Sequence, residues 1–181
     1  MSIGTPALAH LVREKIPHQV HQYEIPETEG PALARGARVH YGPAAAEALQ
    51  VPPAQMLKTL VVSLEPPASA LGERGARPPE IGLALLAVDR EASLKLVARA
   101  FGARRAALLD AADVAKVTGY VIGGVSPFGT KRPLPVVIDD AVLSLPRVYL
   151  SAGQRGTAIE MASVDLIRGL DAHVAPISGA E

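Results

Sequence analysis

Apolar positions along this chain recur with two spacings, one typical of helices and the other typical of strands. Leu8, Leu11 and Val12 share one helical face directly after Thr5 and Pro6. A threonine cap followed by a proline in the first turn favours the start of a helix. The pattern therefore predicts a helix that begins at Pro6.

Four further segments combine helical spacing with residues that favour a helix end. Serine and aspartate side chains accept hydrogen bonds from the first free N–H groups of a helix, and glycine takes up the left-handed conformation that often follows its last turn. We expect these helices from Pro43 to about Gln50, from Ser93 to Phe101 ahead of Gly102, from the Asp110 cap to Gly119, and from the Ser163 cap to about Leu170.

Short apolar runs bounded by glycine and proline predict strands. We expect them at residues 20–25, 57–65, 81–89, 120–122, 134–138, 147–151 and 158–161. Residues 26–42 are interpreted as a loop. Residues 65–80 are interpreted as a long hairpin connection, since the pieces on either side look too short for separate domains. Strands and helices do not alternate one for one, so we expect an α+β fold with a mixed sheet, in a single domain of residues 1–181.

The composition removes several classes of function. Cysteine is absent, which excludes a disulfide scaffold, a thiolate metal site and a cysteine nucleophile. Eighteen basic residues balance eighteen acidic ones, so a polyanion would have to meet a local patch of positive charge. Neither a signal-peptide core nor an apolar run of the roughly 18 residues that span a bilayer is present, and we expect a soluble, cytoplasmic protein.

Common catalytic and cofactor motifs are also missing. The sequence has no G-x-S-x-G elbow, P-loop or G-x-G-x-x-G fingerprint. His18 and His21 fall on opposite faces of a predicted strand. The histidines as a group show no metal-ligand spacing, and we expect neither a metal nor a cofactor. They are His10, His18, His21, His40 and His173.

Lys58 begins the apolar face of a predicted strand. Its side chain lies on the same face as Leu60 and Val62, whereas Thr59 points to the other face. A lysine in this place either extends from the strand end into water or is held in a pocket to meet an anion or a polarised carbonyl group. Position alone favours the first interpretation.

Two glycine-rich segments follow predicted strands. The stretch GGVSPFG at residues 123–129 can present consecutive backbone N–H groups, because glycine tolerates the positive φ angles of an anion-binding nest. A plain wide turn is the alternative. Residues 151–156, SAGQRG, form a similar turn that carries Arg155. Together with Lys58, the two segments favour one shared pocket.

Three motifs in order resemble the YbaK-type prolyl-tRNA editing family, whose close members are Cys-tRNA(Pro) deacylases. They are K-T-L-V-V, then G-Y-V-I-G-G-V-S-P-F-G-x-K, then Y-L-S-A-G-x-R-G-x-x-I-E. The resemblance runs from about Thr5 to the C-terminus. It implies a mixed, partly barrel-like sheet ringed by helices. It also implies cofactor-free removal of a wrongly attached amino acid, chiefly cysteine, from tRNA(Pro), with prolyl-tRNA synthetase as partner.

The resemblance also implies roles for individual residues. Lys58 would be the catalytic lysine, which orients the tRNA 3′ end and the ester, and the cysteine thiol of the substrate would assist its own release. The implied substrate-binding residues are Tyr23, Tyr41, Thr59, Gly123, Gly124, Ser126, Pro127, Ser151 and Gly153. The implied tRNA contacts are Lys131, Arg132 and Arg155, with Arg35, Arg38, Arg104, Arg105 and Lys116 as further candidates. Replacing Gly124 by a bulky residue should then abolish activity and leave the fold intact.

Two departures from the family pattern bear on the substrate. Ala158 stands where the family often has an acidic residue, and the stretch from Glu27 to His40 is longer than expected, so the role of Tyr41 depends on where the insertion lies. Two alternatives stay open. One is a deacylase for another mischarged tRNA, such as Ala-tRNA(Pro), and the other is a non-catalytic module that binds aminoacyl-tRNA or a nucleotide. We expect a monomer or a weak homodimer.

Overall fold

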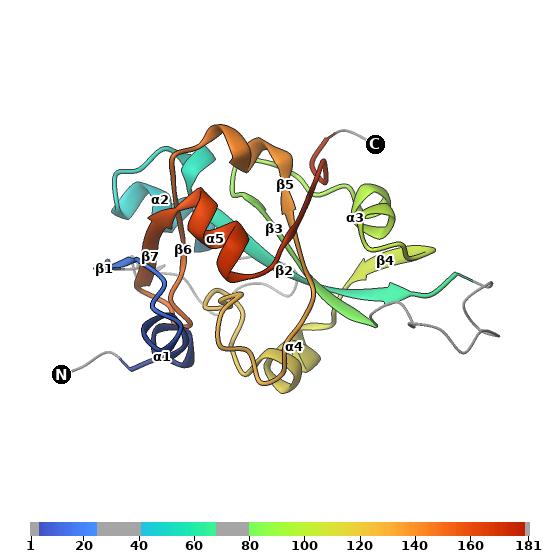
Figure 1. Cartoon of the computed structure of the whole chain (residues 1–181), viewed down its shortest axis with the longest axis horizontal. Coiled ribbons are helices and arrows are strands. Elements are labelled where there is room, and N and C mark those ends of the chain that lie inside the picture. Colours follow the sequence, from blue (N-terminus) through green and yellow to red (C-terminus); the bar gives the residue numbers. More distant parts are fainter. Residues whose placement is uncertain (1–3, 25–40, 68–79, 180–181) are drawn as a thin grey trace, which may run out of the picture.

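The computed structural model describes residues 4–24, 41–67 and 80–179, and its strands form two sheets that lie side by side in Figure 1. One sheet has the strand order β1-β7-β6, and the other has the order β4-β2-β3-β5-β8. The strands are β1 (Gln19–Gln22), β2 (Leu57–Glu65), β3 (Ile81–Ala87), β4 (Arg105–Leu108), β5 (Val136–Asp139), β6 (Arg147–Ser151), β7 (Thr157–Ala162) and β8 (His173–Ala175).

The larger sheet mixes both strand directions. β2 pairs with β3 and β4 in antiparallel register, while β3 with β5 and β5 with β8 are parallel. This confirms the expected α+β fold with a mixed sheet. Among the strands that the structure describes, no pairing joins β4 to β8, so the larger sheet stays open at both edges.

Helices end where the local chemistry of their caps predicts. The side chains of Thr5, Ser93 and Asp110 each accept a hydrogen bond from the first turn that follows, and Gly119 closes its helix with a φ of 84°. The α-helices are α1 (Pro6–Arg13), α2 (Tyr41–Ala48), α3 (Leu94–Ala100), α4 (Ala111–Thr118) and α5 (Ser163–Gly169), and η1 (Pro53–Gln55) and η3 (Asp140–Ser144) are 3-10 helices. The expected cap at Ser163 is wrong. Ala162 holds the cap position, and the buried Ser163 hydroxyl has no partner among the described residues.

Several strand predictions need correction. Residues 120–122 form no strand, because the side chain of Tyr120 is buried while Val121 and Ile122 are exposed and enter a turn. The short strands β4 and β8 were not expected. β2 and β6 have the predicted bounds, whereas β1, β3, β5, β7 and α2 differ from the prediction at their ends, and Tyr41 rather than Pro43 begins that helix. Most of the predicted loops at 26–42 and 65–80, with Arg35, Arg38 and His40, lies outside the described residues.

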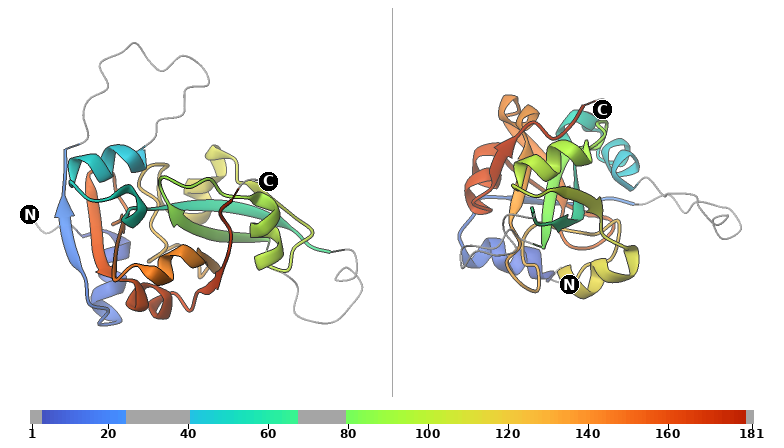
Figure 2. Two further views of the ribbon diagram at one scale, coloured as in Figure 1. Left: turned by 90° about the horizontal axis from the view of Figure 1, so that it is seen from above. Right: turned by 90° about the vertical axis from the view of Figure 1, so that its right-hand side faces the viewer.

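Three apolar clusters hold the elements together. The largest includes Leu11 of α1, Leu85 of β3 and Leu150 of β6, and thus joins the two sheets. A second cluster lies beneath α3, and a third packs α2 against Met56 and Val88. Figure 2 shows the result in its left view: the small sheet stands at one end of the long β2–β3 pair and α3 toward the other. None of the described helices is long and apolar enough to cross a membrane.

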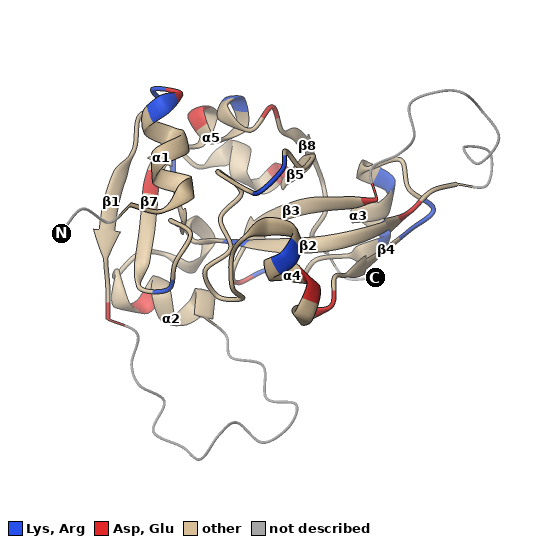
Figure 3. Ribbon diagram, turned by 90° about the horizontal axis from the view of Figure 1, so that it is seen from below, with Lys and Arg blue, Asp and Glu red and all other residues tan. Residues whose placement is uncertain are grey.

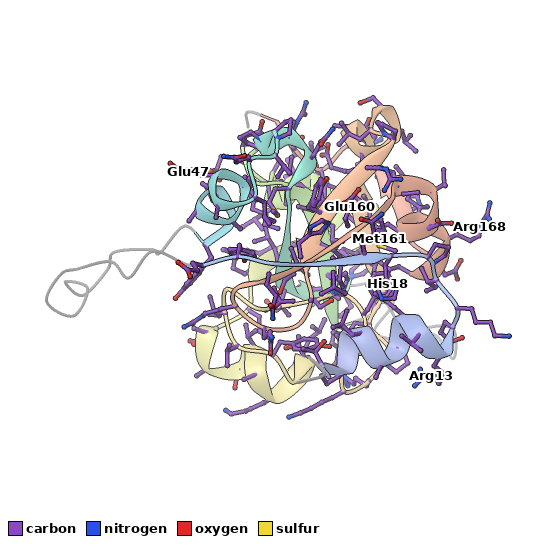
Figure 4. The ribbon with its side chains drawn as sticks, turned by 90° about the vertical axis from the view of Figure 1, so that its left-hand side faces the viewer. Arg13, His18, Glu47, Glu160, Met161 and Arg168 are labelled. Carbon is purple, nitrogen blue, oxygen red and sulfur yellow. The ribbon has the colours of Figure 1, made fainter. Side chains whose placement is uncertain are left out.

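Charged side chains cross-link the small sheet on its outer face. Glu160 of β7 accepts from Arg147 of β6 at 2.7 Å and lies 2.7 Å from the imidazole of His21 on β1. Figure 4 labels Glu160 beside β1. These contacts fix the register of the strand that leads to Tyr23 and of the strand that leads to Ser151, and so they place both residues.

Candidate functional site

The glycine loop begins with a hydrogen-bonded turn. The amide of Gly124 donates to the carbonyl oxygen of Val121 at 2.9 Å, and Gly123 has a φ of 84°. A positive φ at the third position is the mark of a type II turn and explains the glycine there. Part of the loop is therefore the plain turn that the sequence left open as an alternative.

Arg155 binds this turn from the second glycine segment. Its Nε and Nη2 atoms donate to the carbonyl oxygen of Ile122 at 3.0 and 2.8 Å. The same guanidinium group lies over the ring of Tyr41, 4.6 Å from the centroid. The structure thus brings together Tyr41, the glycine loop and the 151–156 turn. We call Tyr41, Gly123, Gly124 and Arg155 the Tyr41 cluster.

Both glycines of the cluster are needed for close approach. A Cβ atom on Gly123 would lie 2.6 Å from the ring of Tyr41, closer than real Cβ contacts come. A Cβ atom on Gly124 would lie 3.1 Å from Cα of Gln154 and 3.2 Å from the amide nitrogen of Arg155. The two glycine segments therefore touch backbone to backbone.

Arg155→Lys tests the link that holds these segments together. Lysine keeps the charge but loses the planar fork and its stacking on Tyr41. An exposed cation–π contact and a hydrogen bond each contribute on the order of 1 kcal/mol, so we expect the free energy of unfolding to fall by about 1 kcal/mol in urea titrations. Arg132→Lys is the control, because exposed Arg132 has no side-chain partner among the described residues. Equal stability of the two variants would contradict the link.

Two amides of the loop belong to partly exposed residues, Gly123 and Val125, and are open to a ligand. The N–H groups of Gly123, Val125 and Ser126 donate no hydrogen bond to any described residue. Backbone donors that point away from the protein can hold a carbonyl or ribose oxygen without any catalytic side chain. Ser126 is buried, so only Gly123 and Val125 offer donors for the predicted nest, and ligand binding there stays a prediction.

The rest of the loop is an anchor. Ser126 and Pro127 are buried, and the Ser126 hydroxyl accepts from the amide of Phe128 at 3.4 Å. Burial raises the pKa of Tyr120 to about 12, so its phenol stays protonated and donates to the Phe128 carbonyl oxygen at 2.7 Å. Ser126 and Pro127 were expected to bind the substrate and to shape the loop. Their buried positions at the base of the loop agree with the second of these roles.

The 151–156 turn is fixed from three sides. The hydroxyl of Ser151 accepts from the amide of Gly153 at 3.2 Å, and the hydroxyl of Thr5 donates to the carbonyl oxygen of Ala152 at 2.5 Å. A Cβ atom on Gly153 would meet the ring of Tyr120 at 2.7 Å. Ser151 and Gly153 therefore shape this turn from within.

Tyr23 borders the same turn. Its amide donates to the carbonyl oxygen of Gly156 at 3.0 Å. Burial raises the pKa of the Tyr23 phenol, and the backbone of Gly156 near the phenol opposes this effect. Tyr23 also packs against the apolar cluster under α2, whose first residue is Tyr41. Both tyrosines therefore stand where the small sheet meets α2.

Lys58 is partly buried, and its ammonium group has a hydrogen-bond partner within the protein. Its Nζ atom donates to the carbonyl oxygen of Arg90 at 2.5 Å, in the loop after β3. Arg90 is held in turn through its guanidinium group, which donates to the Ser178 hydroxyl at 3.1 Å and lies 4.0 Å from Asp139. Neither Arg90 nor Asp139 could be predicted from the sequence, since both act on Lys58 through contacts distant along the chain.

The described contacts of Lys58 include none with the Tyr41 cluster, and packed residues connect the two. Val88, which lies just before Arg90, fills the space where a Cβ atom of Gly42 would be, at 2.4 Å. Gly42 is the neighbour of Tyr41 in α2. In addition, Met56 bridges Tyr149 in parallel, and continuing that alignment by two residues brings Lys58 level with Ser151. The lysine thus stands next to the cluster rather than in it.

Thr59 carries an unpaired buried hydroxyl group. Its Oγ1 atom is buried and has no hydrogen-bond partner among the described residues. A buried hydroxyl group without a hydrogen-bond partner costs about 1–3 kcal/mol of stability. Such groups are rare in native structures, so the unpaired Thr59 hydroxyl needs a physical explanation. The strand pattern alone made Thr59 an ordinary strand residue, whereas the resemblance placed it at the substrate. A ligand that pairs with this hydroxyl would account for it.

The basic residues expected at tRNA lie around the end of α4. Lys131 donates to the carbonyl oxygens of Ala115 and Lys116 at 3.3 and 3.2 Å, so it caps that helix, and Arg132 is exposed beside it. Arg155 uses two donors within the protein. Contact of these residues with tRNA stays a prediction. In the part of the chain that the structure describes, no three His, Asp or Glu side chains gather as metal ligands.

The profile of the family described as "Aminoacyl-tRNA editing domain" matches residues 39–168. A protein of Enterococcus faecalis named "Putative Cys-tRNA(Pro)/Cys-tRNA(Cys) deacylase EbsC" is 27% identical over 177 residues, covering 98% of this chain and 94% of its own. "Multifunctional Ser/Thr-tRNA deacylase ProXp-y" of Escherichia coli is 31% identical over 87 residues, 48% of this chain and 52% of its own.

Solved structures share the fold. One described as a "putative trans-editing enzyme for prolyl tRNA synthetase" superposes with a TM-score of 0.73 at 22% identity, covering 99% of this chain and all of the other. The hypothetical protein APE2540 superposes with a TM-score of 0.74 at 20% identity, covering 97% of this chain. At these identities the likeness concerns the arrangement of strands and helices.

Proposed function

This chain belongs to the aminoacyl-tRNA editing domain family, and from that premise we propose that it removes cysteine from mischarged tRNA(Pro) as a trans-editing deacylase. The observation that carries the proposal is the unpaired Thr59 hydroxyl, in the same strand as Lys58, together with the unused amides of Gly123 and Val125 in the glycine loop. The overall likeness to EbsC, which extends over nearly the full length of both chains, supports cysteine as the amino acid.

The proposed site works by positioning. An aminoacyl ester is already activated, so holding it in a reactive geometry and stabilising the charge that develops on its carbonyl oxygen can suffice. The Lys58 ammonium group would hold the 3′ end and the ester. The amides of Gly123 and Val125 would contact the aminoacyl-adenosine, and Tyr23 and Tyr41 would border it.

The reaction needs one nucleophile and one proton transfer. Either a water molecule or the cysteine thiol of the substrate forms the new bond to the ester carbonyl carbon. The bond from that carbon to the ribose oxygen breaks, and the ribose oxygen takes up the proton that the nucleophile loses. Attack by the thiol would make the reaction a cyclisation, and attack by water would make it a hydrolysis.

A different amino acid is the second candidate. Ala158 replaces the acidic residue that the family pattern often carries, and it is buried in β7 opposite Ser151, so no carboxylate is present there. The local identity with ProXp-y, whose name specifies Ser- and Thr-tRNA, favours this alternative, although the match covers about half of that protein.

A panel of mischarged tRNAs separates these candidates. We expect Cys-tRNA(Pro) to be deacylated at least about tenfold faster than Ala-tRNA(Pro) or Ser- and Thr-tRNA, because a methylene or hydroxyl difference supports discrimination of about 10- to 200-fold. Loss of radiolabelled amino acid from each tRNA measures the rates. A faster rate with Ser- or Thr-tRNA would establish the second candidate. Saturable binding with no cleavage above the uncatalysed rate would leave a non-catalytic module.

A further inference from the structure

An open groove of about 740 Å³ lies between α3 and β4, apart from the Tyr41 cluster. Four of the residues that line it are cations and none is acidic. The cations are Lys95, Arg99, Arg104 and Arg105, all of them exposed. In a chain whose charges balance overall, this is a local excess of positive charge. Figure 3 shows blue segments around α3 and β4 at one end of the molecule.

Most of this charge is uncompensated within the described residues. Arg104 pairs with Glu65 of the neighbouring strand, and the structure describes no ion pair for Lys95, Arg99 or Arg105. The positive potential of the groove therefore depends on three side chains with no described anionic partner. Such a surface attracts a polyanion and loses it as salt is added.

The fold keeps the groove open. Val97 and Ala98 bury the inner face of α3, which leaves Lys95 and Arg99 directed outward. The turn after the helix consists of Gly102 and Ala103, and a Cβ atom on Gly102 would meet nothing within 4 Å. β4 is an edge strand of the larger sheet, and no other strand within residues 4–24, 41–67 and 80–179 covers its outer side. Small residues between two basic walls leave room for a polymer backbone.

The side chains of the groove favour phosphates over other anionic partners. Arginine guanidinium groups match the geometry of phosphate oxygens. The lining includes no aromatic residue on which an unpaired base could stack, which favours a base-paired region, recognised through its backbone. It likewise offers no large exposed apolar side chain to anchor an acidic peptide.

We propose that the α3–β4 groove binds the phosphate backbone of a base-paired stem of the tRNA whose 3′ end enters the Tyr41 cluster. The proposal rests on the proposed function, since that function supplies the tRNA. The chain order supports a continuous path, because β4 leads directly into α4, and α4 ends at the glycine loop. Lys116 on α4 and Lys131 at its end lie along this path, between the groove and the loop.

The test is a variant with three neutralised cations, Lys95→Gln, Arg99→Gln and Arg105→Gln. Uncharged tRNA labelled with a fluorophore is titrated at several salt concentrations, and anisotropy gives the Kd. Each lost phosphate contact lowers the slope of log affinity against log salt by about 0.7–0.9, so we expect a slope smaller by about 2–3 and an affinity lower by about tenfold or more at low salt.

The matched control removes the same charge elsewhere, with Arg13→Gln, Lys15→Gln and Arg168→Gln. Figure 4 shows Arg13 and Arg168 extending outward from the surface, and neither lines the groove. We expect a change in affinity of less than about twofold for this control. An equal loss in both variants would show a general charge effect and overturn the proposal. Unchanged tRNA binding by the groove variant would also overturn the proposal. If that variant bound tRNA normally and lost only its binding of poly-glutamate, the groove would instead belong to an acidic protein partner.

Deacylation separates this proposal from the proposed function. We expect the groove variant to raise the KM for mischarged tRNA by about tenfold and to leave kcat unchanged, because the groove is remote from the ester. Wild-type protein that binds tRNA through the groove yet cleaves no ester would refute the proposed function alone. Wild-type cleavage with an unchanged KM in the variant would refute the groove alone.

Discussion

Lys58→Ala is expected to lower the rate of Cys-tRNA(Pro) deacylation by about 100-fold or more, since removing one preorganised donor from a reacting carbonyl group typically costs about 10²–10³ in rate. The lysine is well placed for such a role because its ammonium group is fixed on the Arg90 carbonyl oxygen. That contact uses one of the three donors of the ammonium group and leaves the others for the ester and the ribose. Single-turnover kinetics with labelled aminoacyl-tRNA measure the loss.

Lys58→Met serves as the companion variant. Methionine keeps most of the apolar stem and removes the charge, so it separates the ammonium group from the packing of the stem. We expect both variants to lose activity alike, with melting temperatures near that of the wild type, because the side chain is only partly buried. A methionine variant that cleaves the ester at the wild-type rate would show that Lys58 has a structural role.

Gly124→Val is expected to lower deacylation by about 100-fold or more. A side chain at this position meets the backbone of Gln154 and Arg155 at 3.1–3.2 Å, and backbone cannot move aside as the end of a flexible side chain can. The loop and the 151–156 turn must therefore separate, which displaces the amides of Gly123 and Val125. Positioning losses of about 1 Å in an active site can cost about 100-fold.

The same contact revises an expectation drawn from the sequence. Replacing Gly124 was expected to leave the fold intact, whereas overpacking of this kind costs about 1–3 kcal/mol. Gly124→Ala gives a milder step in the same direction, and Gly4→Val is the control, because a Cβ atom on Gly4 meets nothing within 4 Å. Urea unfolding and deacylation are measured for all three. Cleavage at the wild-type rate by Gly124→Val would show that the loop is a simple turn with no role in catalysis.

Features that depend on neighbouring residues in the chain could be predicted from the sequence. The caps at Thr5 and Asp110 follow from a side chain two or three residues before its partner, and they were found where expected. Features that depend on distant partners could not. β8 has three residues and exists because β5 offers it a parallel edge, while residues 120–122 lose their strand because the core takes up the side chain of Tyr120.

The candidate site divides in the same way. Glycine spacing predicted that two loops carry backbone donors, and the structure joins those loops through Arg155 and the carbonyl oxygen of Ile122. Arg155 was expected at the tRNA backbone, since a sequence shows the charge of an arginine but not the carbonyl group it faces. Lys58, Arg90 and Asp139 come from three separate stretches of the chain, so no local sequence pattern predicts that Arg90 and Asp139 support Lys58.

The threonine that caps the first helix has a further consequence. Thr5 lies 34 residues before the start of the matched family segment at residue 39, yet its hydroxyl is bonded to the turn that carries Gly153 and Arg155. β8, which pairs with β5 beside Asp139, lies beyond the other limit of that segment at residue 168. The segment that matches the family profile therefore depends on contacts with residues outside it. The two ends of the chain lie outside the family profile and support the candidate site through these contacts. Substitutions in either end can therefore alter the geometry of the site without changing a residue inside it.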